Sequence, residues 1–242
     1  MRLRTSTIVA ACSLFLLSAA VAQAPADSEP HAAAVAGVAD LMVAAQFRHI
    51  KLWFAGKLQN WRLASFELDL MKARLLEAAK LSPASQAQDT AAKPMQSLQE
   101  AIGKKDPAGF AKAYTELTNA CNACHRALDR GFISIQVPVT SPFSDEEFVD
   151  PVAGGRALAH SVCGECHVIS ENANETPALR FQAPSFPSLA RRAALTDDSL
   201  REFLSSNHRN LGQDKAMPNP RLAEYQIEQI IAYFSTLRAN AQ

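Results

Sequence analysis

Two short stretches of the chain combine two cysteines and a histidine at a fixed spacing. They are Cys121-Asn122-Ala123-Cys124-His125 and Cys163-Gly164-Glu165-Cys166-His167. Both read C-x-x-C-H, the signature for covalent attachment of a c-type haem. Two thiols at this spacing can bond to the two vinyl groups of one porphyrin, and the adjacent histidine can offer a nitrogen to the iron. The sequence therefore predicts two covalently bound haem c groups. The cysteines are predicted to form the thioethers, and His125 and His167 are predicted to bind the irons.

Two other kinds of site can be built from C-x-x-C pairs. Two pairs together can hold a zinc ion, and a single pair can act as a redox dithiol. In both alternatives the residue after the second cysteine is free to vary, whereas here it is histidine in both copies. The first pair also lies within a long helical pattern, where a zinc knuckle would need tight turns. Haem attachment is therefore the favoured interpretation. It uses four of the five cysteines, and the fifth, Cys12, lies in a segment that we expect to be removed.

The composition places the chain among ordinary globular proteins. Its 242 residues are enough for two domains, and 48% of them are apolar, which allows sizeable cores. Lys plus Arg and Asp plus Glu both number 24, so the formal net charge is zero. No basic stripe or run of Lys and Arg is present, so we expect no nucleic-acid partner.

The first 22 residues have the three parts of a secretory signal peptide. Arg2 and Arg4 form the charged start, residues 8–17 form the apolar middle, and Ala20-Val21-Ala22 gives the small-x-small cleavage site. The alternative is a retained membrane anchor, but the apolar run is shorter than the ~20 residues that a membrane span needs. We therefore expect cleavage after Ala22, no stable membrane span afterwards, and a periplasmic location. Export agrees with haem attachment, because bacteria attach c-type haem outside the cytoplasm, where thiols can be handled oxidatively.

The first half of the mature chain has the apolar periodicity of long helices. Residues 23–31 are predicted as a loose lead-in. From there, apolar residues recur at spacings of three and four over about 32–56, 61–81, 94–102 and 107–128. Gly103 is a predicted helix end, and Asp106-Pro107 a predicted N-cap with a first-turn proline. Cys121 and Cys124 continue the apolar stripe of the fourth helix, so both thiols should face inward. The fold class is predicted to be all-α, with an antiparallel four-helix bundle over 32–137.

This half resembles the cytochrome c-prime family, four-helix bundles whose haem is attached near the end of the last helix. The resemblance is carried by the C-x-x-C-H at 121–125 and by a long first helix with an apolar face. It implies that the far side of the iron faces the first helix, where Met42 matches the position of the ligand found in some members. The alternative role of Met42 is core packing. His49 shares its face and is the rival ligand, and if neither binds, the site is open to a small gas.

The remainder of the chain reads as a linker followed by a second all-α domain. Residues 138–151 hold three prolines among polar residues and are predicted as an inter-domain linker. Residues 152–242 resemble the class I cytochrome c domain in the order of their landmarks. These are Gly155, the C-x-x-C-H at 163–167, the loop at Pro184, Met217-Pro218, and Ala232-Tyr233-Phe234 in the last helix. The resemblance implies that Met217 is the sixth ligand and that the carbonyl of Pro184 accepts a hydrogen bond from His167. It also implies that Gly155 allows a close helix crossing.

These features favour electron transfer over catalysis. His/Met coordination leaves the iron no open position for a substrate, and no Gly-x-Ser-x-Gly or His-Glu-x-x-His motif is present. The leading hypothesis is a periplasmic di-haem electron carrier that meets redox partner proteins through small, transient interfaces. One alternative is a sensor or scavenger of nitric oxide or carbon monoxide with an open bundle haem. Another is peroxide reduction, for which His49 would be the acid–base group. A homodimer through the first two helices is implied by the resemblance alone.

Overall fold

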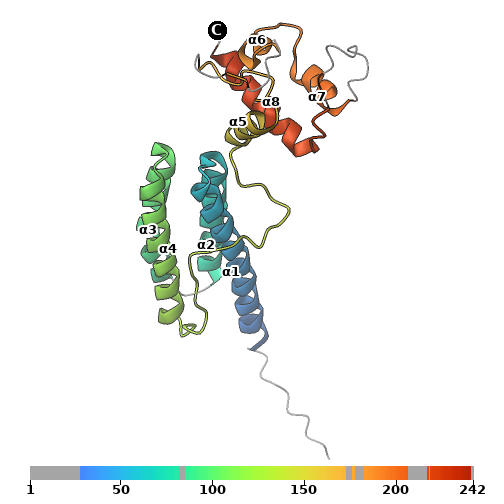
Figure 1. Ribbon diagram of the computed structural model, residues 1–242. Helices are drawn as coiled ribbons and strands as arrows, with labels where there is room; N and C mark the ends of the chain where they lie inside the picture. The colour runs from blue at the N-terminus through green and yellow to red at the C-terminus, as the bar shows by residue number, and fades with distance from the viewer. Residues whose placement is uncertain are drawn as a thin grey trace, which may run out of the picture.

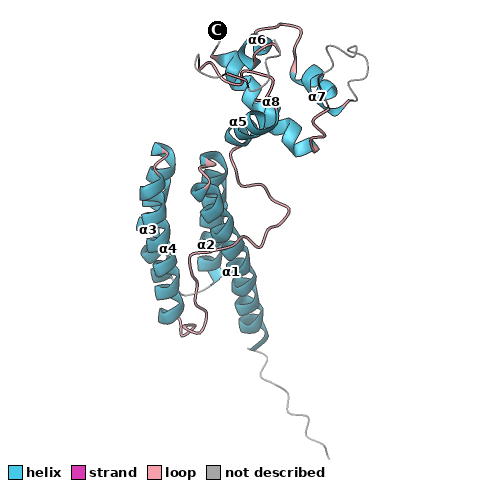
Figure 2. Cartoon of the chain, in the orientation of Figure 1, coloured by secondary structure: helices cyan, strands magenta, loops and turns pink. Residues whose placement is uncertain are grey.

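A computed structural model of the chain describes residues 28–81, 85–172, 176–177, 183–206, 217 and 219–240. Within these residues all regular structure is helical, which confirms the predicted all-α class (Figures 1 and 2). The signal peptide predicted over residues 1–22 lies outside the described residues. The helices are α1 (Ser28–Lys57), α2 (Trp61–Leu81), α3 (Ser85–Lys104), α4 (Pro107–Ala127), α5 (Pro151–Val162), α6 (Phe186–Ala190), α7 (Asp197–Ser205) and α8 (Glu224–Ala239).

The buried apolar side chains form two separate cores, so we describe two units, α1–α4 and α5–α8. The first core gathers Leu52, Leu68, Leu98 and Leu117 from its four helices. In this unit α1 packs most extensively against α2, and α3 against α4. The second core is centred on α8, which packs against α5, α6 and α7 through side chains such as Ile230 and Phe234. Each C-x-x-C-H therefore belongs to a unit with a core of its own.

Several local signals in the sequence act as predicted. Oδ1 of Asp106 accepts from the backbone N–H groups of Ala108 and Gly109, both at 3.1 Å, and Pro107 occupies the first turn of α4. Because the first N–H groups of a helix have no partner within it, this cap fixes where α4 begins. Gly155 allows the predicted close crossing, since a Cβ there would lie 1.8 Å from the carbonyl oxygen of Gln229 on α8.

Two helices are longer than the sequence pattern predicts. α1 already begins at Ser28, so the end of the predicted lead-in is helical. α3 runs from Ser85 to Lys104 with Pro94 inside it, and the expected stop at Gly103 lies two residues early. The residue that leaves the helical conformation is Lys105, whose φ is 53°. Apolar residues are sparse in these extensions, so periodicity alone could not detect them.

The segment that connects α4 to α5, residues 128–150, lies against the first unit. Phe148 is 5% exposed and belongs to the first core, and Val137 and Phe143 pack against that core. Nδ2 of Asn60, in the α1–α2 turn, donates to the carbonyl of Val149 at 3.4 Å. Most of the segment predicted as a linker is therefore anchored to the first unit. From the end of α4 it runs back to the opposite end of the first unit before α5 begins (Figure 1).

None of the helices in the described ranges combines the length and the apolar character that a membrane crossing requires.

Candidate haem-binding sites

The two cysteine pairs lie in different structural settings. Cys121 and Cys124 occupy the last turns of α4, and Cys121 packs against the first core. Cys163 ends α5 as its C-cap residue and is buried in the second core, and Cys166 follows in a turn. The four thiols do not share one site, as a zinc ribbon would require. In the described part of the chain, no three His, Cys, Asp or Glu side chains gather as a metal-ligand group.

Three of these thiols, those of Cys121, Cys124 and Cys163, have a raised pKa. Burial, with a smaller contribution from Cys124, raises the pKa of Cys121 to about 11. Burial, again reinforced by the second cysteine of the pair, raises the pKa of Cys163 to about 11. A catalytic dithiol needs the opposite environment, because the thiolate is the nucleophile and its pKa is lowered by positive charge or a helix N-terminus. The raised pKa values of Cys121 and Cys163 therefore do not favour the redox-dithiol alternative.

In the first site, His125 is oriented by a backbone carbonyl. Its Nδ1 lies 2.8 Å from the carbonyl oxygen of Ile133. A carbonyl only accepts hydrogen bonds, so Nδ1 carries the hydrogen and Nε2 keeps its lone pair. The chain reaches this position by a sharp reversal after α4, where Asp129 has a φ of 57° and the N–H of Arg130 donates to the carbonyl of His125 at 2.7 Å.

In the second site, His167 is oriented in the same way by different means. Its Nδ1 lies 2.7 Å from the carbonyl oxygen of Pro184, the contact that the family resemblance implies. The N–H of Phe186 donates to the carbonyl of Val168 at 2.9 Å, which ties the Pro184 loop to the histidine segment. Phe186 is buried and its ring lies edge-on to His167, with a centroid distance of 5.5 Å. Nε2 of His167 is again the nitrogen with a free lone pair.

His49, the rival ligand, is a hydrogen-bonded core residue. It is 4% exposed, with Nε2 lying 3.0 Å from Oγ1 of Thr118 and Nδ1 lying 2.8 Å from the hydroxyl of Tyr114. Each of these hydroxyls also donates to a backbone carbonyl, Thr118 to that of Tyr114 at 2.9 Å and Tyr114 to that of His49 at 2.7 Å. Burial lowers the pKa of His49 to about 4, which keeps the ring neutral. Both nitrogens are therefore engaged, and neither is available to iron or as an acid–base group.

Met42 lies at the level of the first cysteine pair. The contacts of His49 with Thr118 and of Trp53 with Phe110 show that α1 and α4 run antiparallel. Met42 precedes His49 by two helical turns, which places it opposite the end of α4 that carries the C-x-x-C-H. It is half-buried and is not among the residues that pack against the first core. The position fits a side chain that faces the first haem site.

Met217, the proposed sixth ligand of the second site, is half-buried and packs against the second core. Pro184 is exposed, so its contribution to the site is its carbonyl group.

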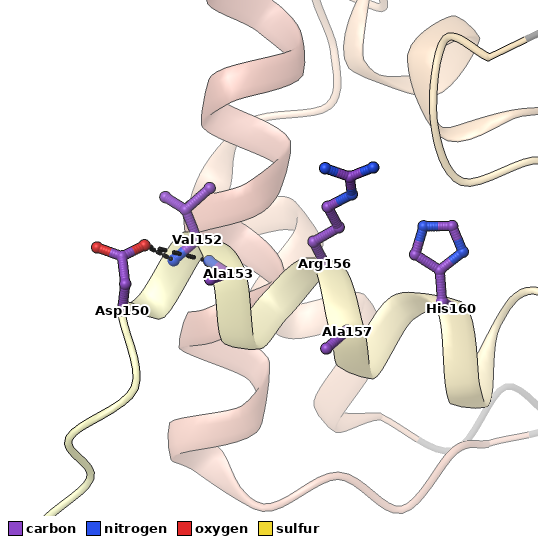
Figure 3. A pocket seen from close by; sticks show the side chains of 6 residues that line it. All are labelled: Asp150, Val152, Ala153, Arg156, Ala157 and His160. Atoms are coloured by element: carbon purple, nitrogen blue, oxygen red, sulfur yellow. Dashed lines mark hydrogen bonds between the residues drawn. The ribbon is translucent and has the colours of Figure 1, made fainter. Parts of the chain in front are cut away.

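A surface pocket lies along α5 and is lined by Asp150, Arg156 and His160, among others (Figure 3). Asp150 caps the start of this helix. The pocket contains none of the predicted site residues.

Sequence reasoning missed two features of the first site. One is the Ile133 carbonyl on His125, because a backbone group leaves no trace in residue type. The other is Asn122, whose side chain makes two hydrogen bonds with the backbone of Ile135. An asparagine inside C-x-x-C-H is a weak signal on its own, since the two middle positions of the motif tolerate many residues.

The arrangement fits haem c at both places. Each site offers two free thiols beside one histidine, with Nδ1 occupied by a carbonyl and Nε2 available. Such a carbonyl is the usual partner of a metal-bound histidine, and it sets both the tautomer and the ring orientation. Comparison with protein-family models, with curated proteins and with solved structures gave no match for this chain.

Proposed function

We propose that the chain is an exported di-haem c-type cytochrome that carries electrons between redox partner proteins in the periplasm. In this proposal α1–α4 is a four-helix bundle like that of cytochrome c-prime, and α5–α8 is a class I cytochrome c domain. The observation that carries the proposal is the pairing of each C-x-x-C-H with a carbonyl 2.7–2.8 Å from Nδ1 of its histidine. The same chemical device appears in two unrelated local folds, as expected if both histidines bind a metal.

The proposal gives each residue of the two sites a role. In the first site, Cys121 and Cys124 would form the thioethers, Nε2 of His125 would bind the iron, and Met42 is the candidate on the opposite side. In the second site, Cys163, Cys166 and His167 take the corresponding roles, with Met217 opposite. When bound, haem iron supplies a reversible one-electron change. Two methionine ligands would leave no position for a substrate, which is why we propose electron transfer and not catalysis.

The gas-binding alternative depends on Met42 alone. Because both ring nitrogens of His49 are engaged by Thr118 and Tyr114, His49 does not supply a sixth ligand. If Met42 packs beside the haem without binding the iron, the first site is open to nitric oxide or carbon monoxide. The engagement of His49 also counts against peroxide reduction, for which it was the acid–base candidate.

Anaerobic optical spectra of the reduced protein, with and without carbon monoxide, test the proposal. We expect the unmodified protein to show no change, and Met42→Ala to gain carbon monoxide binding at one of its two haems. Met217→Ala is the matched variant for the second site and should open the other haem. Carbon monoxide binding by the unmodified protein would instead support the sensor or scavenger function.

The proposed partner contacts are of two kinds. Each site lies in its own unit, so each can meet a redox partner through a small, transient interface. A homodimer through α1 and α2 is also proposed, and exposed apolar side chains on these helices, Val43, Phe66 and Leu76, support it. Sedimentation of the mature protein over a range of concentrations would measure its oligomeric state, and a monomer at all concentrations would contradict the proposed homodimer.

A further inference from the structure

Asn122, inside the first C-x-x-C-H, clamps the chain that returns after α4. Its Nδ2 donates to the carbonyl of Ile135 at 2.8 Å, and its Oδ1 accepts from the N–H of Ile135 at 2.7 Å. One side-chain amide thus satisfies both backbone groups of a residue 13 positions away. A paired contact of this kind fixes both the distance and the orientation of the segment that it holds.

The clamped residue lies two positions after the carbonyl that contacts His125. Ile133, which provides that carbonyl, is held on its other side by the N–H of Ile133 donating to the carbonyl of Arg130 at 2.9 Å. Side-chain packing holds little of the chain at and beside these two anchors, because Phe132 is 81% exposed and the side chains of Ile133 and Ser134 are also exposed. The next apolar anchor along the chain is Val137. The position of the Ile133 carbonyl therefore depends on Asn122.

We propose that Asn122 is a positioning residue for the first haem site, acting on His125 through the backbone of residues 133–135. This inference rests on the proposed function, because it assigns to Asn122 control over a histidine that binds iron. A carbonyl held on Nδ1–H makes the imidazole a stronger electron donor at Nε2. Asn122 therefore lowers the reduction potential of the first haem and holds the ring of His125 in one orientation.

The second site shows what replaces this clamp. The carbonyl that contacts His167 belongs to Pro184, whose ring fixes its φ, and the next two residues are the N-cap Ser185 and the buried Phe186. Its C-x-x-C-H has Gly164 at the position of Asn122, and glycine has no side chain to form a clamp. Loss of the clamp should therefore change one haem and leave the other as an internal reference.

The test compares Asn122→Ala with Gln136→Ala, a change of an exposed residue in the same returning segment. Both are made in the full-length protein with its haems attached. In Asn122→Ala we expect the potential of the first haem to rise and the potential of the second haem to be unchanged. The backbone N–H of Ile135 should exchange with solvent about tenfold faster, since it loses one hydrogen bond. Gln136→Ala should change none of these.

Three results separate the outcomes. Faster exchange at Ile135 with an unchanged first-haem potential would overturn the inference, because the clamp would hold the segment without acting on His125. An unmodified protein with fewer than two covalent haems would refute the proposed function instead. If Asn122→Ala does not acquire its first haem, hydrogen exchange at His125 in the unmodified protein provides the test. A hydrogen on Nδ1 of His125 that exchanges as fast as in a free imidazole would overturn the inference, and slow exchange would support it.

Discussion

The two C-x-x-C-H sites reach the same local geometry by different routes. In the first, the pentapeptide lies in a 21-residue helix, and the carbonyl for His125 comes from a returning segment clamped by a side chain. In the second, the pentapeptide follows a 12-residue helix, and the carbonyl for His167 comes from a proline loop beside a buried phenylalanine. The comparison shows that the motif determines which atoms are used, whereas the surrounding fold determines how they are oriented.

The two cores also differ, in whether they contain buried polar side chains. Among the described residues, every buried polar or charged side chain is in the first unit: His49, Asn60, Glu67 and Thr118. Each has a hydrogen-bond partner, as burial demands. The second core is apolar, and Tyr233 places its hydroxyl on the carbonyl of Ile169 at 3.0 Å. We therefore expect the two units to respond differently to substitution and to pH.

The largest expected effect is the loss of one haem at a time. Replacing Cys121 and Cys124 with serine should halve the haem content, because serine cannot form the thioether bonds. The same change at Cys163 and Cys166, made in a separate variant, should also halve it, by removing the other haem. A haemochrome assay of each purified variant measures the ratio of haem to protein, with Cys12→Ser as the control that keeps both haems. If either of these cysteine-to-serine variants retained two haems, the claim that each cysteine pair attaches one haem would be contradicted.

Two glycines should distinguish the units by stability. Gly155→Ala would place a Cβ 1.8 Å from the Gln229 carbonyl, and Gly56→Ala would place one 2.1 Å from the buried ring of Phe110. We expect each change to destabilise its own unit by about 3 kcal/mol. Tryptophan fluorescence during urea unfolding reports the first unit alone, because Trp53 and Trp61 are the only tryptophans. Gly56→Ala should shift that transition, and Gly155→Ala should shift only the circular dichroism transition of the second unit.

Gly103→Ala is the matched control for both changes. A Cβ at this position meets nothing within 4 Å, so the change should stabilise α3 by up to about 1 kcal/mol. Equal effects of the three substitutions would show that the close contacts at Gly56 and Gly155 do not decide stability.

The buried histidine predicts a pH dependence confined to the first unit. The pKa of His49 is lowered by burial from 6.5 to about 4 in the folded protein. Between these values the unfolded chain binds a proton that the folded unit excludes, so the free energy of unfolding falls as pH falls from 6.5 to 4. The full loss is about 3 kcal/mol. Urea unfolding followed by tryptophan fluorescence measures it, and His49→Gln should flatten the profile over this range. An unchanged slope in that variant would assign the pH dependence to other groups.

The smallest expected effect concerns the anchoring of the connecting segment. Lys51 on α1 forms an ion pair with Glu146 and lies over the ring of Phe143, 4.6 Å from its centroid. Glu146→Gln removes the charge attraction and should cost about 0.5 kcal/mol, because partly exposed ion pairs are screened by water and salt. Phe148→Ala removes a core side chain from the same segment and should cost about 3 kcal/mol or more. If the two changes were equal in urea unfolding, burial of the segment would not be what anchors it.

Much of the helical architecture could be predicted from the sequence, because it depends on local signals. The apolar periodicity located α2 and α4, and Asp106-Pro107 located the start of α4. The close crossing at Gly155 followed from the family resemblance, and in the structure a Cβ there would lie 1.8 Å from the Gln229 carbonyl. The anchored connecting segment could not be predicted, since Phe143 and Phe148 lie in a proline-rich stretch without periodicity. Their burial depends on a surface built by distant residues.

The same limit applies to the candidate sites. The cysteines and histidines are specified by their spacing, and the Pro184 contact followed from a family resemblance. The Ile133 carbonyl, the Asn122 clamp and the hydrogen bonds of His49 depend on which segments meet in three dimensions. Met42 was identified through the family resemblance, by its position along the first helix, and the structure places it at the level of the first cysteine pair.

The intact mass of the denatured, exported protein tests the central claim most directly. Denaturation removes any haem that is held only by coordination, so the measurement counts covalent attachment alone. We predict the mass of residues 23–242 plus two haems, from a host that can attach c-type haem. The bare polypeptide mass, or that mass plus a single haem, would contradict the claim that both C-x-x-C-H sites hold haem c.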